Sequence, residues 1–191
     1  MRYLKTPLDG VTLLEPEILG DNRGYFFEAV RCDELERHLG HPFTLVQQNE
    51  SSSAEGVVRG LHFQLPPYAQ SKLVRVVRGA ILDVAVDIRR GSPTFGQHVA
   101  VELSEENHRA LFIPRGFAHG FSVLRGEAVV QYMCDNGYDK ASEGAIAWND
   151  AELNIDWGIE PERAILSAKD LANRPLAECD KFFEYNINYY A

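Results

Sequence analysis

Short runs of apolar and β-branched residues follow one another along most of the chain, and turn-forming residues bound nearly all of them. Many short strands at regular spacing are typical of a β-sandwich or β-barrel. The pattern predicts strands at residues 24–30, 44–48, 57–63, 72–77, 80–88, 97–103, 109–113, 118–123 and 128–134. We therefore expect an all-β fold with a few short peripheral helices.

Two glycine-containing dipeptides separate neighbouring predicted strands. Arg78-Gly79 and Arg125-Gly126 each lie between two apolar runs, a pattern typical of a tight hairpin connection. Residues 91–94, with the sequence Gly-Ser-Pro-Thr, predict a longer turn.

The predicted strand at 80–88 alternates between two kinds of side chain. A period of two places Leu82, Val84, Val86 and Ile88 on one face and Ile81, Asp83, Ala85 and Asp87 on the other. Asp83 therefore points either into a wet barrel lumen or into solvent, and this strand alone does not separate the two.

One helix is expected near residues 33–39. Asp33 can cap it, Glu36 follows three residues later, Leu35 and Leu39 share a face, and Gly40 can end it. A second short helix is expected around residues 168–173.

The composition agrees with a single domain spanning residues 1–191. Hydrophobic residues make up 45% and charged residues 25%, which argues against disorder and against a coiled coil. Apolar runs are too short to cross a membrane, and the N-terminus lacks the apolar core of a secretory signal, so we expect a cytoplasmic protein. A net charge of −9 works against binding nucleic acid or an anionic membrane.

The three cysteines, Cys32, Cys134 and Cys179, are widely spaced and never form a CxxC pair. This pattern predicts reduced, packed thiols instead of a disulfide framework or a zinc site.

Two of the six histidines stand out. His62 and His119 each lie in a strand-like run beside glycine and aromatic residues, where a histidine is more often structural than functional. The other four lie in polar surroundings and are expected to be solvated: His38, His41, His98 and His108.

The spacing Pro114-x-Gly116-x-x-His119 is similar to the second motif of the cupin superfamily, and residues 56–62 resemble its first. Metal-binding cupins carry HxH followed by a carboxylate in that first motif, which supplies ligands for iron, manganese or zinc. Here the pair is His62-x-Gln64, and a neutral amide is a poor replacement ligand. We therefore expect no metal, which disfavours a metal-dependent cupin oxygenase.

A closer resemblance extends over nearly the whole chain. Eight segments, in order, resemble the dTDP-4-dehydrorhamnose 3,5-epimerase family: DNRGYFFE at 21–28, VRGLHFQ at 58–64, AQSKLVR at 69–75, LDVAVDIR at 82–89, SPTFG at 92–96, IPRGFAHGF at 113–121, WND at 148–150 and LSAKD at 166–170. The resemblance implies a cupin-like jelly-roll barrel, a homodimer, no metal or organic cofactor, and a dTDP-4-keto-6-deoxyhexose substrate. It also implies an isomerase of dTDP-L-rhamnose biosynthesis.

The chemistry of such an enzyme explains the residue types of the candidate catalytic set. Hydrogens on C3 and C5 become acidic because the C4 ketone can hold the charge as an enolate, so the site needs a base, an oxyanion stabiliser and an acid. His62 suits the base and Lys72 the cation. The resemblance assigns the proton donor to Tyr132 and the residue that orients His62 to Asp170, with Asp83 as a second candidate.

The resemblance also supplies substrate-binding positions. Arg23 and Arg59 match pyrophosphate ligands, and Phe26 and Tyr138 match aromatic surfaces for thymine. The remaining positions are expected to contact base, ribose, sugar or phosphate: Glu28, Gln47, Asn49, His119, Glu143 and Lys169.

Two departures from the family pattern lie near the expected pocket. The chain has Gln47-Gln48-Asn49-Glu50 where many members have an acidic residue between the glutamine and the asparagine and a histidine after them, and it lacks a proline soon after Tyr138. The expected reaction converts dTDP-4-keto-6-deoxy-D-glucose to dTDP-4-keto-L-rhamnose. An epimerase acting at C3 or C5 alone stays open, as does a noncatalytic cupin that binds sugar nucleotides.

Overall fold

The computed structural model describes residues 1–191 and contains thirteen strands and two short α-helices. The strands are β1 (Arg2–Lys5), β2 (Thr12–Glu15), β3 (Leu19–Asp21), β4 (Gly24–Phe26), β5 (Gln47–Ser53), β6 (Val58–Gln64), β7 (Lys72–Asp87), β8 (Arg89–Arg90), β9 (His98–Ser104), β10 (Ala110–Ile113), β11 (Phe117–Cys134), β12 (Glu143–Ala145) and β13 (Phe183–Glu184). The helices are α1 (Cys32–Leu39) and α2 (Ala168–Leu171). Single 3₁₀ turns occur at Pro161–Arg163 and Leu176–Glu178.

Two long bent strands organise the fold. β7 and β11 run antiparallel from Phe117 opposite Asp87 to Cys134 opposite Lys72, with register shifts between residues 123 and 130 of β11. The predicted hairpins at Arg78-Gly79 and Arg125-Gly126 are therefore wrong, because both dipeptides are bends inside continuous strands. Gly79 has a φ of 74°, and a Cβ there would lie 2.5 Å from the Glu127 carbonyl oxygen, so glycine lets the strands stay paired around the bend.

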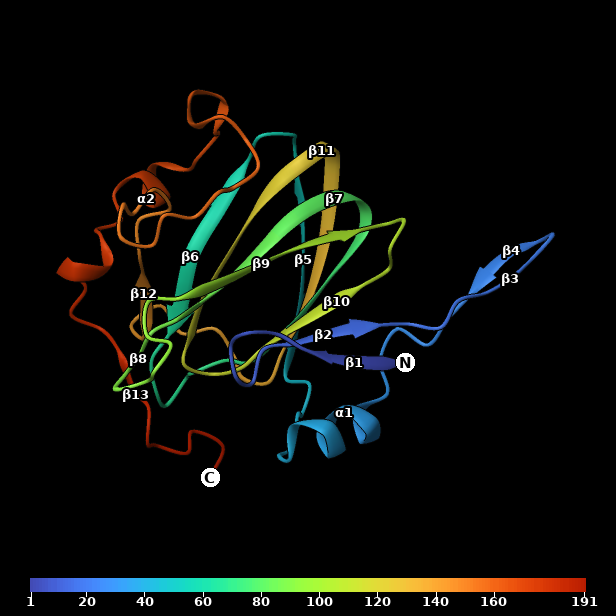
Figure 1. Cartoon of the computed structure of the whole chain (residues 1–191), viewed down its shortest axis with the longest axis horizontal. Coiled ribbons are helices and arrows are strands. Elements are labelled where there is room, and N and C mark those ends of the chain that lie inside the picture. Colours follow the sequence, from blue (N-terminus) through green and yellow to red (C-terminus); the bar gives the residue numbers. More distant parts are fainter.

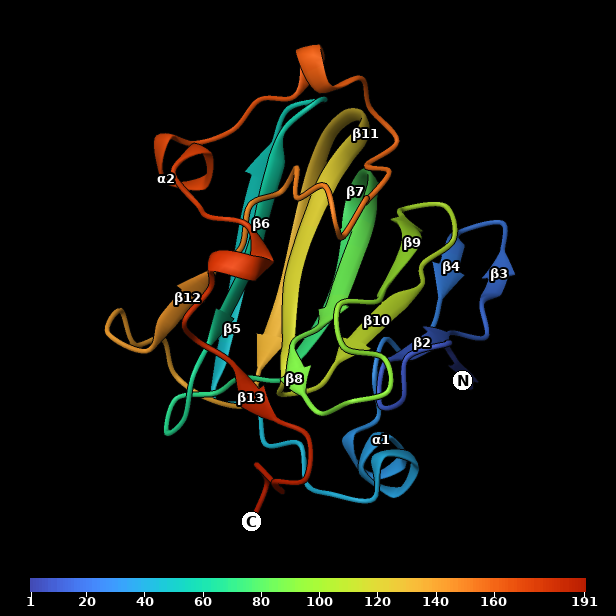
Figure 2. The ribbon, with the colours of Figure 1, turned by 60° about the vertical axis from the view of Figure 1, so that its left-hand side comes forward.

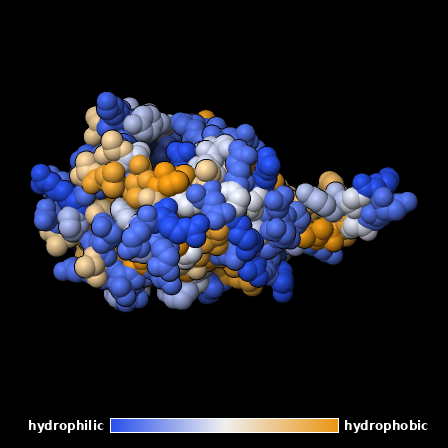
Figure 3. All heavy atoms as spheres, turned by 90° about the horizontal axis from the view of Figure 1, so that it is seen from above, coloured by the Kyte–Doolittle hydropathy of each residue, from blue (hydrophilic) through white to orange (hydrophobic).

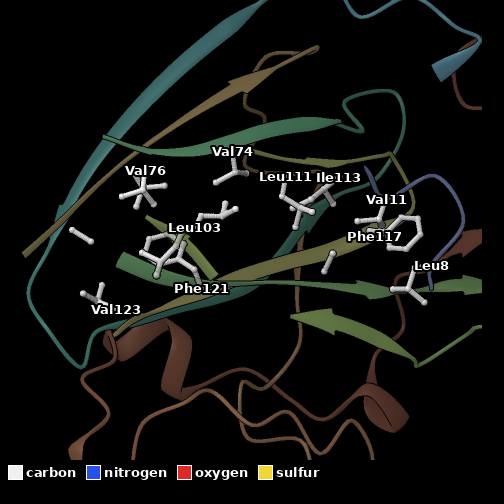
Figure 4. Close-up of a cluster of buried hydrophobic side chains, with 14 residues drawn as sticks. Leu8, Val11, Val74, Val76, Leu103, Leu111, Ile113, Phe117, Phe121 and Val123 are labelled. Atoms are coloured by element: carbon white, nitrogen blue, oxygen red, sulfur yellow. The ribbon is translucent and has the colours of Figure 1, made fainter. Parts of the chain in front are cut away.

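The bends divide the strands between two facing layers, as Figures 1 and 2 show. One half of the β7–β11 pair is flanked by β10, β2, β1 and β5, and the other half by β9, β6 and β12. Apolar side chains from both layers, including Val74, Leu103, Phe117 and Phe121, meet between them (Figure 4). This is the cupin-like jelly roll expected from the sequence.

Asp83 lies on the interior face of β7. Ile81 and Ala85, on the same face, belong to the cluster between the layers, while Val84 and Val86 pack outward under the C-terminal segments. Asp83 has no exposed surface, so the solvent alternative is wrong for this face.

The strand β5 differs from its prediction at 44–48 because its sequence, QQNESSS, is polar throughout. It pairs with residues 128–134 of β11, and its side chains alternate between half-buried and exposed up to Ser53, which is buried. Half-buried polar side chains on this strand are the first sign of a hydrophilic cleft.

A two-stranded arm, formed by β3 and β4, projects from the body of the molecule (Figures 1 and 3). The strand predicted at 24–30 is thus only three residues long, and it pairs with β3 alone. Leu19, Tyr25 and Phe26 are 59%, 64% and 65% exposed, which leaves large apolar side chains uncovered on the arm.

The helix α1 begins one residue earlier than predicted. Arg31 is its N-terminal capping residue, and Asp33 lies in the first turn, where it pairs with Arg31 and Arg37, so the predicted Asp33 cap is wrong. Gly40 ends the helix in a left-handed conformation, as expected. The predicted helix at 168–173 is confirmed as α2, which lies beside β6 in Figures 1 and 2.

The cysteines are free thiols, but only Cys134 is fully buried. Cys179 is half-buried, and Cys32 is exposed on α1, so the prediction of a packed thiol is wrong for Cys32. The chain contains no helix long and apolar enough to cross a membrane.

Of the four histidines expected to be solvated, His38 is exposed, but His41, His98 and His108 are half-buried, so the prediction is wrong for these three. His38 stacks on Tyr3 and His41 on Tyr190, while burial lowers the pKa of His98. His108 packs against Tyr25 and Phe27 at the base of the arm.

Candidate active site

A cavity of about 440 Å³ opens between the two layers. Its walls come from β6, β7 and β11 and from residues 165–170, and they include His62, Lys72 and Tyr132. An adjoining cavity of about 300 Å³ shares these three residues and extends toward β5 and β12. The predicted base, cation and acid therefore lie at the junction of one cleft.

Close approach of two strands places His62 and His119 side by side. The two residues are paired opposite each other in the β6–β11 ladder. A Cβ on Gly60 would lie 2.6 Å from the Gly120 Cα, so glycine is needed for β6 to lie this close to β11.

The imidazole of His62 is held by Asp170. Its Nε2 lies 2.6 Å from Oδ1 of Asp170, whose Oδ2 accepts a hydrogen bond from the Ser167 hydroxyl at 2.7 Å. Burial alone would raise the pKa of Asp170, but hydrogen bonds from His62 and Ser167 lower it below its ordinary value. A carboxylate only accepts hydrogen bonds, so Nε2 of neutral His62 carries the proton and Nδ1 keeps a free lone pair.

The second aspartate candidate contacts a different histidine. Oδ1 of Asp83 lies 2.7 Å from Nε2 of His119, and Oδ2 of Asp83 is buried without a hydrogen-bond partner. Burial lowers the pKa of His119, and the charges of Lys72 and His62 add to the shift while Asp83 opposes it. The structure thus pairs His62 with Asp170 and leaves Asp83 to orient a neutral His119.

Lys72 starts β7 and lies opposite both Ile113 and Cys134 in the sheet. Burial lowers the pKa of its ammonium, against the opposing effect of Asp83 and Glu143. No carboxylate in the protein forms an ion pair with Lys72, so its side-chain nitrogen is free to contact a ligand in the cavity.

Tyr132 comes from the part of β11 that pairs with β5, where it lies opposite Asn49. Burial raises the pKa of its phenol, so the hydroxyl is protonated at neutral pH. His62 belongs to β6, in the other layer, so the two groups approach the cavity from different layers of the bent sheet.

Predicted binding residues line the adjoining cavity. Gln47, Asn49, Tyr138 and Glu143 all contribute to its wall. The Tyr138 hydroxyl donates to Oε2 of Glu143 at 3.2 Å, and Oε1 of Glu143 pairs with Lys169. Hydrogen bonds from Lys169 and Tyr138 lower the pKa of Glu143 despite its partial burial, so it is a carboxylate in this network.

Arg59 lies at the rim of the larger cavity. Its Nε donates to the Ser53 hydroxyl at 3.0 Å and its Nη2 to the Ser52 carbonyl oxygen at 3.3 Å. These neutral partners orient the guanidinium without neutralising it, so its charge can bind an anion.

Three predicted binding residues lie outside the cleft of the same chain. Arg23 and Phe26 are on the projecting arm and Glu28 follows it, and none of them lines either cavity. Arg23 is instead paired with Asp21 on the arm.

Ser167, Gln64 and Gln70 line the cleft but were not among the predicted site residues. Ser167 caps α2 through the Asp170 backbone N–H, and the Ser-x-x-Asp pattern before a helix could have revealed it. The sequence pattern identifies Gln64 only as a poor replacement for a metal ligand. Among the residues of the chain, no group of three or more His, Cys, Asp and Glu side chains is arranged to hold a metal ion.

Comparison with known proteins places this cleft in a family. A family model described as dTDP-4-dehydrorhamnose 3,5-epimerase matches residues 5–178. The dTDP-4-dehydrorhamnose 3,5-epimerase of Shigella flexneri is 47% identical over 182 residues, covering 95% of this chain and 99% of that protein. A dTDP-4-dehydrorhamnose 3-epimerase of Streptomyces niveus is 40% identical over 82% of this chain and 76% of its own.

A solved structure agrees with these matches. The crystal structure of dTDP-6-deoxy-D-glucose-3,5-epimerase from Legionella pneumophila, in complex with dTDP-4-keto-L-rhamnose, superposes with a TM-score of 0.93 at 45% identity. The alignment covers 97% of this chain and 99% of that one.

Proposed function

This chain belongs to the dTDP-4-dehydrorhamnose 3,5-epimerase family, and from that premise we propose that it inverts C3 and C5 of dTDP-4-keto-6-deoxy-D-glucose to give dTDP-4-keto-L-rhamnose. The chain is an isomerase. The observation that carries the proposal is the meeting of His62, Lys72 and Tyr132 at one cavity, with Asp170 bonded to the histidine.

In the proposed reaction, Nδ1 of His62 removes the proton from the carbon next to the C4 ketone. The electron pair moves onto the ketone oxygen, and the enolate that forms is stabilised by the Lys72 ammonium. The Tyr132 phenol then delivers a proton to the opposite face of the same carbon, which inverts it. Solvent restores the proton to Tyr132 and accepts the one held by His62, and the same cycle at the second carbon completes the reaction.

We assign the nucleotide to the polar surroundings of the catalytic groups. Arg59 has an unneutralised guanidinium, which suits the pyrophosphate. Tyr138 presents an exposed ring at the adjoining cavity, which suits stacking on thymine. Contacts to base, ribose and sugar fall to Gln47, Asn49, His119, Glu143 and Lys169.

The arm supports a homodimer. Arg23 and Phe26 are predicted to bind substrate, yet they lie on the arm that projects from the body of the molecule (Figure 3), and neither lines the cavities that contain His62. A second copy related by a two-fold axis would receive the arm at its cleft and cover the exposed Phe26. A cytoplasmic location and the lack of a nucleic-acid partner stay predictions, the latter resting on the net charge of −9.

Subunit complementation tests the arm. A chain with His62→Asn keeps its arm, and a chain with Arg23→Ala and Phe26→Ala keeps its base, so each homodimer should be nearly inactive. A purified heterodimer of the two has one complete site and should recover roughly half of the wild-type activity. A monomeric mass by light scattering, or an inactive heterodimer, would contradict this arrangement.

Proton NMR of the substrate in deuterated water tests the reaction. Deuterium should enter at both C3 and C5, with inversion at both. Inversion at one carbon alone would establish a single-centre epimerase, as in the Streptomyces niveus relative, and no exchange would leave a binding protein. Full activity after exhaustive chelation is expected, because Asp170 already holds the Nε2 of His62. Loss with chelator and recovery with one metal would support an oxygenase-like metal site.

A further inference from the structure

Residues 136–141 form a loop that carries Tyr138 to the cleft. No backbone group in this loop hydrogen-bonds another backbone group. Tyr138 is 58% exposed, so packing against neighbouring side chains does not fix its ring either. The position of Tyr138 therefore depends on side chains that bond the loop from outside.

Three glutamines bond the backbone at residues 136–139, while Lys181 bonds the Ala141 carbonyl oxygen and the Tyr138 hydroxyl donates to Glu143. Gln70 donates to the Asn136 carbonyl oxygen at 2.8 Å, and Oε1 of Gln47 accepts from the Tyr138 N–H at 3.0 Å. Gln64 makes two bonds to the loop, one on each side of Tyr138: its Nε2 donates to the Gly137 carbonyl oxygen at 3.1 Å, and its Oε1 accepts from the Asp139 N–H at 2.8 Å.

Gln64 is the most constrained of the three. It is 5% exposed and lies on β6 two residues after His62. The second hydrogen of its Nε2 bonds the Tyr68 carbonyl oxygen at 2.7 Å, so both amide hydrogens and the amide oxygen have partners. A terminal amide supplies two donors and an acceptor together, which a carboxylate of the same shape cannot do.

We propose that Gln64 is a positioning residue for nucleotide binding, which fixes Tyr138 in the orientation that stacks on the base. This rests on the proposed function, since it takes the nucleotide as the ligand of Tyr138. Metal-binding cupins carry a ligand at this position. In this chain Gln64 instead connects β6, which carries the catalytic base His62, to the loop that carries Tyr138. Nucleotide binding then loses less conformational entropy, because the loop is ordered before the ligand arrives.

Gln64→Glu tests the proposal with the smallest change in shape. The carboxylate still accepts from the Asp139 N–H, but its other oxygen faces the carbonyls of Tyr68 and Gly137. We expect the dissociation constant for dTDP, measured by calorimetry at pH 8, to rise roughly tenfold or more. At saturating substrate the rate of proton exchange should stay within about threefold of wild type, because catalytic groups are untouched.

Acidification should rescue this variant. Protonation gives the Glu side chain an O–H that can donate to one of the two carbonyls, so the ratio of its dissociation constant to that of wild type should shrink as the pH falls from 8 to 5.5. Gln97→Glu is the matched control, because Gln97 is exposed and lies outside both cavities, and it should bind dTDP like wild type. Gln64→Asn, which adds no charge but is too short, replaces Gln64→Glu if that variant fails to fold.

A double-mutant cycle shows whether Gln64 acts through Tyr138. In a Tyr138→Ala background, Gln64→Glu should change the dissociation constant by less than about twofold. The same tenfold loss in both backgrounds would overturn the proposal, as would wild-type affinity in the single variant.

Amide hydrogen exchange without ligand separates this proposal from the proposed function. Gln64→Asn, whose shorter side chain cannot reach the loop, should speed exchange at Asp139, because Oε1 of Gln64 accepts from its N–H, and this holds whatever the ligand turns out to be. Faster exchange with no dTDP binding by wild type would refute the proposed function and leave the loop contact standing. Unchanged exchange would refute the contact itself.

Discussion

Nε2 of His62 lies 2.6 Å from Oδ1 of Asp170, although the two residues are 108 positions apart in the sequence. His62 is fixed on β6 and Asp170 on α2, where Ser167 caps the helix and bonds the carboxylate. This contact decides which ring nitrogen is free. With Asp170 ionised, the neutral imidazole presents Nδ1 as the base.

Asp170→Asn should reduce kcat strongly. The amide can still occupy the space, but it can donate to Nε2 and so favour the tautomer in which Nδ1 is protonated. We expect a loss on the order of 100-fold or more, with a much smaller change in KM. Steady-state kinetics at pH 7.5 measure it, and a loss of less than about threefold would show that Asp170 does not set the tautomer.

Lys72→Met should lower turnover more than affinity, because its charge acts on an enolate that exists only during the reaction. Loss of one such group typically costs about 3–4 kcal/mol of barrier, or roughly 10²–10³-fold in kcat. Because burial lowers the pKa of Lys72, wild-type kcat should also decline on the alkaline side below the ordinary lysine value of about 10.4. An unchanged kcat in Lys72→Met would remove Lys72 from the mechanism.

Arg59→Ala should have the opposite kinetic signature. The pyrophosphate is present in both ground and transition states, so its loss raises KM with little effect on kcat. A rise of roughly tenfold or more is expected for a charge-assisted contact. If kcat falls while KM is constant, Arg59 acts on the reacting sugar instead.

Asp87 should account for part of the acid sensitivity of the fold. It is fully buried, and hydrogen bonds from Arg89, Ser92 and Thr94 lower its pKa, although burial opposes the shift. A group whose pKa is lower in the folded state stabilises the protein at pH values above its unfolded pKa, about 3.9 for Asp. This stabilisation is lost as the pH falls through the folded-state pKa. Asp87→Asn should lower the free energy of unfolding by about 1.5–3 kcal/mol at pH 7. It should also make that free energy fall less steeply between pH 5 and 2. Denaturant titrations across that range measure the effect, and an equally steep decline in the variant would be contrary to it.

The sequence predicts the strands whose apolar pattern is continuous and misses what depends on packing. Residues 72–88 appear as two strands joined by a turn, because Gly79 has the same local signature in a hairpin and in a bend. Only pairing with β11 on both sides of the bend separates them. β5 was misplaced because a strand that lines a polar cleft lacks the apolar alternation of a core strand.

The family resemblance predicts the site as a set of residues, and the structure adds which of these residues contact one another. Nothing local in the sequence distinguishes Asp83 from Asp170 as the partner of His62, since both contacts join distant segments. The sequence also does not predict that Gln64 holds the loop of Tyr138. Its three hydrogen-bond partners are backbone atoms, and their positions do not depend on residue type. The placement of Arg23 and Phe26 depends on the direction of an arm that projects from the fold.

The central claim is that His62 removes a proton from one face of the carbon and Tyr132 returns one to the opposite face. It is tested most directly by Tyr132→Phe and His62→Asn in deuterated water. Tyr132→Phe keeps the base, the Lys72 cation and the ring, and it deletes only the acid. The enolate should still form, and deuterium should return to the same face, so NMR should record exchange with retained configuration. His62→Asn should show neither exchange nor inversion. Normal inversion by Tyr132→Phe, or exchange persisting in His62→Asn, would contradict the account.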